Sequence, residues 1–220
     1  MTNVRLSEMR RFASLEYEFD QSRHLLRSSL GECVAISLLW IQDKTINTNR
    51  PGIVDNRLFR FRLLGTSRAH QEIVSRASNM RAGAIPDVAT IRRMEDDLGI
   101  RRVMNGSLAG TAADMNMNPI MVMEQLSGVL PFGNAALVRV DSRLGQSPNH
   151  VVALYKSRSG TLHFFDANLG SFSVRSDSYQ QFFRRWKFVH IADDPGEDIV
   201  TGLLDFSGGQ GYAYRQYARS

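Results

Sequence analysis

The feature that most constrains this chain is the run CVAISLLWI at residues 33–41, which places apolar side chains on every face of a helix. The run holds no proline, begins two residues after Gly31, and ends at the polar residues 42–44. A helix that lacks a polar face is normally buried in the centre of a domain. Other elements must therefore cover this helix, and Cys33 is expected at its N-terminal end.

Length and composition favour one globular domain around such a helix. The chain has 220 residues, of which 43% are hydrophobic and 22% charged, so it has enough apolar material for a core. No stretch approaches 18 uninterrupted apolar residues, which argues against a membrane-spanning helix. The first ten residues lack the apolar segment of a Sec signal peptide. Cys33 is the sole cysteine, which excludes an internal disulfide and a Cys-rich zinc site, and no metal or cofactor is expected.

The positive charge of the chain is scattered along the sequence. The net charge is +5 and the pI about 9.7, and all but three of the 27 basic residues are arginines. The arginines are spread along the chain, with four adjacent pairs and no single basic block, and without a zinc-finger or RNP pattern, so we expect no nucleic-acid partner. A basic chain leaves open a peripheral contact with an anionic membrane surface. The sequence leaves the oligomeric state open.

The hydrophobic period changes along the chain from helical to strand-like. We interpret residues 1–27 as an N-terminal segment, flexible or related to secretion, and residues 28–220 as one domain. Helical patterns dominate residues 70–130, with one helix running from Pro86 to Gly99. Strands are expected at 135–140, 150–156, 161–166 and 188–191, and a helix from Asp177 through Trp186. These patterns predict an α+β fold with helices first and an antiparallel sheet late.

The strands at 150–156 and 161–166 form a predicted hairpin whose register can be worked out. If Lys156 pairs with Gly160 across a three-residue loop, His150 lies directly opposite Asp166. Both would share a buried face with four apolar residues, Val152, Leu154, Leu162 and Phe164. A one-residue slip would break this pairing.

Cys33, His150 and Asp166 together have the chemistry of a thiol enzyme. A carboxylate orients an imidazole, and the imidazole takes the proton from a thiol. Each residue also has a plain structural interpretation: Cys33 as a small core residue, His150 as a histidine with ordinary hydrogen bonds, and Asp166 as a turn former. His163 is expected on the opposite face of the hairpin.

Three short blocks around these residues resemble a known family. They are Gly31-x-Cys33-x-x-x-Ser37-x-x-Trp40, His150-Val-Val-Ala153, and Phe165-Asp-Ala-Asn-Leu-Gly-Ser-Phe172, which resemble the YopT/AvrPphB-type effector cysteine proteases. The resemblance implies a papain-like fold in which a central buried helix carries the Cys and packs on an antiparallel sheet that carries the His and Asp. It implies Cys33, His150 and Asp166 as catalytic residues, and Asn168, Gly170 and Phe172 as residues that shape the turn holding Asp166.

One position departs from the papain-like pattern. Papain-like enzymes usually place a Gln or Asn five or six residues before the Cys, as a donor to the oxyanion hole. This chain has Ser28 and Arg27 there. The backbone N–H of Cys33 can still donate, and Ser28 is a candidate to assist it.

The resemblance implies a cysteine endopeptidase that a bacterium delivers into a host cell without a Sec signal, through a type III system. It would act in the host cytoplasm or at its membrane, on a host protein such as a small GTPase or a protein kinase. Two alternatives stay open. The triad could serve a thiol acyltransferase or deamidase, or a catalytically impaired papain-like fold could act as a host-protein binding module.

Overall fold

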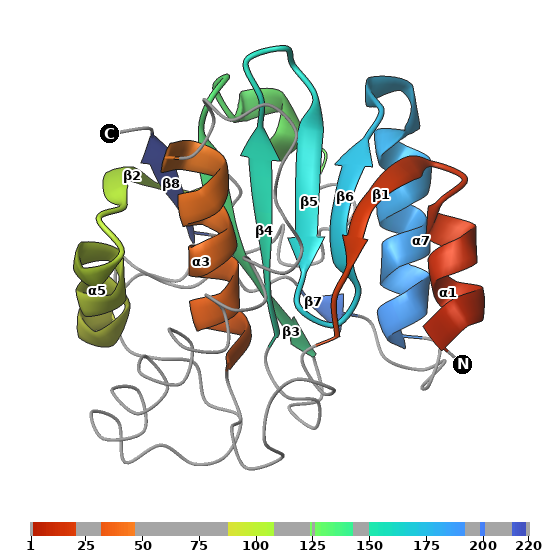
Figure 1. Cartoon of the computed structure of the whole chain (residues 1–220), viewed down its shortest axis with the longest axis horizontal. Coiled ribbons are helices and arrows are strands. Elements are labelled where there is room, and N and C mark those ends of the chain that lie inside the picture. The colour runs from red at the N-terminus through yellow and green to blue at the C-terminus, as the bar shows by residue number, and fades with distance from the viewer. Residues whose placement is uncertain are drawn as a thin grey trace.

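The computed structural model describes a mixed fold of helices and one antiparallel sheet (Figure 1). The described residues are 2–20, 32–46, 88–107, 124, 126–142, 150–191, 199–200 and 213–218. Within this part of the chain, no helix is long and apolar enough to cross a membrane. The sheet order is β1-β6-β5-β4-β3-β8-β2, and β7 pairs with β3 off this path.

The centre of the sheet is a meander of four strands. It consists of β3 (Ala135–Ser142), β4 (His150–Lys156), β5 (Leu162–Asp166) and β6 (Gly170–Val174), each antiparallel to the next. The strands β3, β4 and β5 confirm the predictions for these segments. The remaining strands are β1 (Ala13–Glu18), β2 (Arg101–Ser107), β7 (Ile199–Val200) and β8 (Ala213–Ala218).

The apolar run forms α3 (Glu32–Ile46), as predicted, and α3 packs on β4 and β3. Every residue from 33 to 41 is at most 5% exposed. The ring of Trp40 stacks on Phe165 with centroids 5.5 Å apart, which fixes the contact between helix and sheet. This helix is therefore covered as its lack of a polar face requires.

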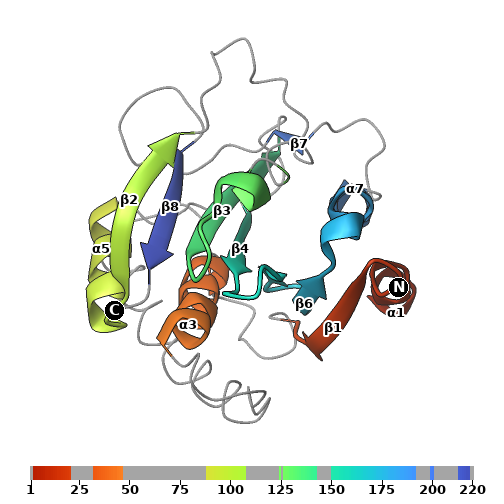
Figure 2. The same ribbon diagram turned by 90° about the horizontal axis from the view of Figure 1, so that it is seen from above.

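The opposite face of the sheet carries α7 (Tyr179–Ile191), which follows a short 3-10 turn, η2 (Ser176–Ser178). Figure 2 shows α3 and α7 on the two sides of the sheet. Phe164 of β5 makes edge contacts with Phe182, Phe183 and Trp186 of α7, at centroid distances of 5.3–5.7 Å. Alternate residues of β5 thus pack on opposite faces of the sheet: Phe165 faces α3 and Phe164 faces α7.

Two further helices flank the sheet. The first, α1 (Thr2–Met9), packs on α7, and Arg185 forms an ion pair with Glu8. The second, α5 (Val88–Asp97), confirms the helix predicted at 86–99, and it packs on α3. After α5, Gly99 adopts a φ of +62°, the left-handed conformation typical of the end of a helix.

Two secondary-structure predictions are wrong. Residues 101–107, placed in a helical region, form β2 and pair with β8. Residues 188–191, predicted as a strand, are the last turn of α7. Both segments are short and lack a clear hydrophobic period, so their neighbours in the fold decide their state.

The N-terminal segment contributes a strand that the predictions do not include, although its residues ASLEYE alternate apolar and polar side chains. β1 pairs with β6 at the edge of the central meander, with Ala13 opposite Val174 and Glu18 opposite Gly170. The proposed domain boundary at residue 28 lies outside the described residues, so it stays a prediction.

Candidate active site

The pairing of the strands defines two ends of the sheet. At one end, Val152, Asp166, Gly170 and Glu18 lie side by side on β4, β5, β6 and β1. His150 begins β4 at the same end, where its backbone lies opposite Val140. We call this the Asp166 end. In Figure 1 it is the lower end of the sheet, where β5 finishes and β4 starts.

The N-terminal half of α3 also points to the Asp166 end. Ser37 Oγ, one helical turn after Cys33, donates to the backbone carbonyl of Val151 at 3.5 Å. Val151 follows His150 directly. The structure therefore brings the backbones of Cys33, His150 and Asp166 to the same end of the sheet.

Cys33 is the second residue of α3 and is 4% exposed. It precedes an unbroken row of buried residues, so its backbone is held by the packing of the helix on the sheet. The first turn of a helix carries partial positive charge from its free N–H groups. A thiol at such a position has the surroundings that reactive cysteines use.

Asp166, the last residue of β5, is fully buried and is held by donors from two directions. Its Oδ1 accepts the backbone N–H of Asn168 at 2.8 Å. Its Oδ2 accepts the indole N–H of Trp186 at 2.8 Å. The first contact is an Asx turn, and the second comes from α7. The sequence pattern predicts Trp186 on a helix but carries no signal that its N–H faces Asp166.

Gly170 closes the turn after Asp166 and can only be glycine. Its φ is +119°, a conformation that L side chains rarely adopt. A Cβ there would overlap the Tyr17 carbonyl oxygen and lie 2.9 Å from the Phe19 nitrogen. The close approach of β1 to the turn thus depends on this glycine, in agreement with its predicted role in shaping the turn.

The predicted register of the hairpin is wrong by two positions. Lys156 lies opposite Leu162, not Gly160, and Asp166 lies opposite Val152, not His150. The side chain of His150 lies outside the described residues. Since the shift is an even number of residues, each strand keeps its faces, and positions 150 and 166 become diagonal neighbours instead of direct partners.

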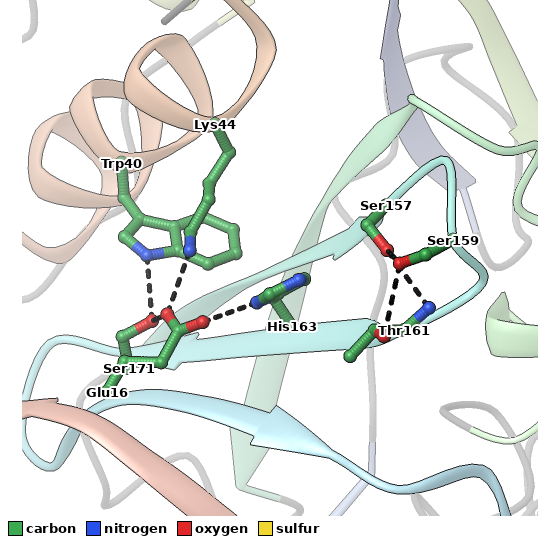
Figure 3. A network of polar contacts seen from close by, with 8 residues as sticks. All are labelled: Glu16, Trp40, Lys44, Ser157, Ser159, Thr161, His163 and Ser171. Atoms are coloured by element: carbon green, nitrogen blue, oxygen red, sulfur yellow. Dashed lines mark hydrogen bonds and ion pairs between the residues drawn. The ribbon is translucent and has the colours of Figure 1, made fainter. Parts of the chain in front are cut away.

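The loop of the hairpin explains the shift. Gly160 has a φ of +88° and occupies the last loop position, so the three-residue loop is 158–160 instead of 157–159. Ser157 and Thr161 close the loop through the backbone contact Ser157 N to Thr161 O, at 2.9 Å. Ser157 Oγ also accepts the Thr161 N–H at 3.0 Å and contacts Ser159 Oγ at 2.8 Å (Figure 3).

Ser28, the candidate side chain for the oxyanion hole, lies outside the described part of the chain, as do Arg27 and Gly31. The predicted role of Ser28 stays a prediction. Among the described residues, no cluster of three or more His, Cys, Asp or Glu side chains could hold a metal ion.

A second polar cluster lies on the α3 face of the sheet and is centred on Glu16 of β1 (Figure 3). His163 Nδ1 lies 2.6 Å from Glu16 Oε1, and Lys44 Nζ lies 2.8 Å from Oε2. Ser171 Oγ donates to Oε2 at 2.6 Å and accepts the indole N–H of Trp40 at 3.1 Å. His163 thus lies on the face opposite to that of Asp166, as predicted.

Charge and hydrogen bonding hold Glu16 ionised in this cluster. Burial raises its pKa, but the hydrogen bond with His163 and the positive charges of Lys44 and His163 lower it more, to about 2 from 4.5. Glu16 therefore joins β1 to α3 and β5, the two elements that carry Cys33 and Asp166. This cluster lies on the α3 face of the sheet and links the elements that position Cys33 and Asp166.

Comparison with known proteins connects this arrangement to a family. A peptidase family model described as Yersinia/Haemophilus virulence surface antigen matches residues 100–190. This range contains His150 and Asp166, while Cys33 precedes it. The comparison with the curated proteins finds no match.

Two solved structures share the fold. One is the avirulence protein AvrPphB of Pseudomonas, with 13% identity and a TM-score of 0.54 over 96% of this chain and 97% of that chain. The other is PatoxP, the cysteine protease-like domain of the Photorhabdus asymbiotica toxin PaTox, with 11% identity and a TM-score of 0.51 over 99% of this chain and 57% of that chain. The predicted resemblance to the YopT/AvrPphB-type family and the papain-like α+β fold are confirmed.

Proposed function

We propose that this chain is a papain-like cysteine endopeptidase in which Cys33 is the nucleophile, His150 the general base and acid, and Asp166 the residue that orients His150. The observation that carries the proposal is the meeting of three elements at the Asp166 end of the sheet. The start of α3, the start of β4 and the end of β5 each supply one of the three residues there. The family match over residues 100–190 supports the same roles for His150 and Asp166.

The proposed reaction has two steps that share one imidazole. The Cys33 thiol gives its proton to His150 and its sulfur attacks the carbonyl carbon of the scissile peptide bond. His150 then protonates the leaving amine, the C–N bond breaks, and a thioester remains on Cys33. In the second step His150 takes a proton from water, hydroxide attacks the thioester, and the thiol is restored. Asp166 stabilises the imidazolium in both steps.

The substrate class and the delivery route rest on the family resemblance. A virulence-associated peptidase would act on a host protein, and small GTPases and protein kinases are the classes that the resemblance implies. We propose secretion by a type III system and action in the host cytoplasm or at its membrane.

The experiment that tests the proposed function compares protein N-termini in a host-cell lysate after incubation with the full chain or with its Cys33→Ala variant. We expect new N-termini only with the wild type, and their loss in His150→Ala. The matched control is His163→Ala, which removes the histidine on the α3 face of the sheet, and this variant should still produce the new N-termini. Modified side chains without new termini would contradict the peptidase and favour an acyltransferase or deamidase. Unchanged termini and side chains, with host proteins retained equally by wild type and Cys33→Ala, would favour the binding module.

A further inference from the structure

The end of the sheet opposite to Asp166 is formed by four turns. Ala13, Val174, Leu162 and Lys156 lie side by side as the last paired residues of β1, β6, β5 and β4 at this end. The turns just beyond them are residues 10–12, 175–178 and 157–161, and the turn 127–134 leads into β3 beside Lys156. We call these four turns the basic end. Figure 1 shows the β4–β5 hairpin and the turn before α7 at this upper end.

The basic end has a strong excess of exposed positive charge. Its turns contain four arginines, Arg10, Arg11, Arg158 and Arg175, and a single acidic residue, Asp177. All five of these side chains are exposed. Lys156 adds a half-buried ammonium group beside them. Because the row crosses five neighbouring strands, from β3 to β1, it is about 20 Å long at the usual strand spacing.

Two large apolar side chains are exposed at one end of this row. Phe132 is 64% exposed and Val129 is 56% exposed, and both lie in the segment 127–134, with Val129 at the end of the helical residues 126–129 and Phe132 in the turn that follows. Lys156 Nζ lies 4.9 Å from the centre of the Phe132 ring and donates to the Ser127 carbonyl at 3.1 Å. The turn therefore presents an aromatic ring and an aliphatic side chain to solvent, directly beside a fixed positive charge.

We propose that the basic end is a docking surface for anionic phospholipid membranes, with Phe132 and Val129 inserted among the lipids and the arginines on the headgroups. A row of cations supplies attraction to anionic lipids, and exposed apolar side chains supply the second contribution that stable peripheral binding needs. Protein interfaces instead place an apolar patch at their centre and surround it with a polar rim. Here the arginines form the row and the apolar pair lies at its end, an arrangement that suits a flat lipid surface.

This orientation has a consequence for the candidate site. A membrane bound at the basic end lies at the far end of the strands from Cys33, His150 and Asp166. The Asp166 end then faces away from the lipid. The proposal does not depend on proteolysis, because the docking surface shares no residue with the proposed catalytic residues.

The experiment is co-sedimentation of the full chain with vesicles of phosphatidylcholine, with and without phosphatidylserine. We expect binding only to the anionic vesicles, and weaker binding as the ionic strength rises. Replacing Phe132→Ser should weaken the binding roughly tenfold. The double variant Arg10→Glu with Arg158→Glu should weaken it by roughly twentyfold or more.

The matched control is the double variant Arg92→Glu with Arg93→Glu, because these exposed arginines lie on α5, away from the basic end. It changes the net charge of the chain equally and should keep most of the binding. Equal losses in the two double variants would overturn the proposal, as would equal binding to neutral and anionic vesicles. Binding to polyglutamate, a model of an acidic protein, is measured in parallel. If the Arg10/Arg158 variant loses polyglutamate binding but keeps vesicle binding, the surface is assigned to an acidic protein and the membrane proposal is overturned. Circular dichroism of each variant establishes that it is folded.

Discussion

One oxygen of the Asp166 carboxylate accepts the indole N–H of Trp186 from α7. Replacing Trp186→Phe keeps a large ring in the core but leaves a buried carboxylate oxygen without the donor that lies 2.8 Å away. We expect a loss of about 1–3 kcal/mol in the free energy of unfolding, and slower alkylation of Cys33 as Asp166 loses its fixed position. Urea denaturation and labelling with iodoacetamide measure the two effects.

The other tryptophan provides the control for this prediction. Trp40 also donates its indole N–H, to Ser171 on the α3 face of the sheet. Trp40→Phe should therefore lower stability but change the alkylation rate less than Trp186→Phe does. A larger effect of Trp40→Phe on alkylation would contradict a specific role of Trp186 in positioning Asp166.

Gly170 is the residue at which a single methyl group should be most costly. The variant Gly170→Ala combines a positive φ with an overlap on the backbone of β1, and we expect it to lower the free energy of unfolding by about 3 kcal/mol or more. Gly133→Ala is the comparison, because Gly133 also has a positive φ, +80°, but no atom within 4 Å of its added Cβ. That variant should cost only about 1 kcal/mol. Equal losses in urea denaturation would show that contact with β1 does not matter.

Among the elements, β1 pairs with β6 through its backbone and is also joined to α3 and β5 through Glu16. Because the pKa of Glu16 is lower in the folded chain, about 2 against 4.5, the unfolded chain binds more protons as the pH falls through this range. The stabilisation is complete above about pH 4.5 and is lost progressively toward pH 2, and it amounts to roughly 3 kcal/mol.

The test is the difference in unfolding free energy between the wild type and Glu16→Gln, measured across the acid range. We expect the wild type to be more stable near neutral pH and the difference to shrink as the pH falls below about 4.5. Other carboxylates affect both proteins alike, so the difference isolates Glu16. A difference that stays constant from neutral pH to pH 2 would exclude the ionised Glu16 as the link.

The elements that the sequence predicts well are those with a strong apolar pattern. α3 and the strands β3, β4 and β5 were predicted because their apolar runs are long or bounded by clear turn residues. β1 and β6 were missed although both alternate apolar or small residues with polar ones, as ASLEYE and GSFSV. Both are only five or six residues long, and what makes them strands is their pairing with each other and of β6 with β5.

The candidate site was predictable in part. Cys33, His150 and Asp166 could be selected from local patterns, and the structure brings their backbones to one end of the sheet. The predicted direct pairing of His150 with Asp166 is wrong because the register depends on whether Gly160 ends the loop or begins the strand, and the sequence pattern does not decide this. The partner of Asp166, Trp186, comes from α7, which packs on the face of the sheet that carries Phe164 and Asp166, and no local pattern encodes that contact.

For the whole molecule, the sheet separates two kinds of chemistry. The Asp166 end gathers the three proposed catalytic residues, while the basic end presents exposed arginines and Phe132. Because the strands separate the two ends, this chain can bind a membrane through the basic end while the Asp166 end stays open to another protein. The two proposals can therefore be tested on separate variants of the same full chain.

The central claim is that Cys33 is a nucleophile activated by His150. Since Cys33 is the sole cysteine, the rate of iodoacetamide alkylation reports on this thiol alone. At about pH 6, where an ordinary thiol is almost fully protonated, we expect rapid alkylation of the wild type, a loss of at least about tenfold in His150→Ala, and little change in His163→Ala. Slow alkylation of the wild type that His150→Ala leaves unchanged would contradict the claim.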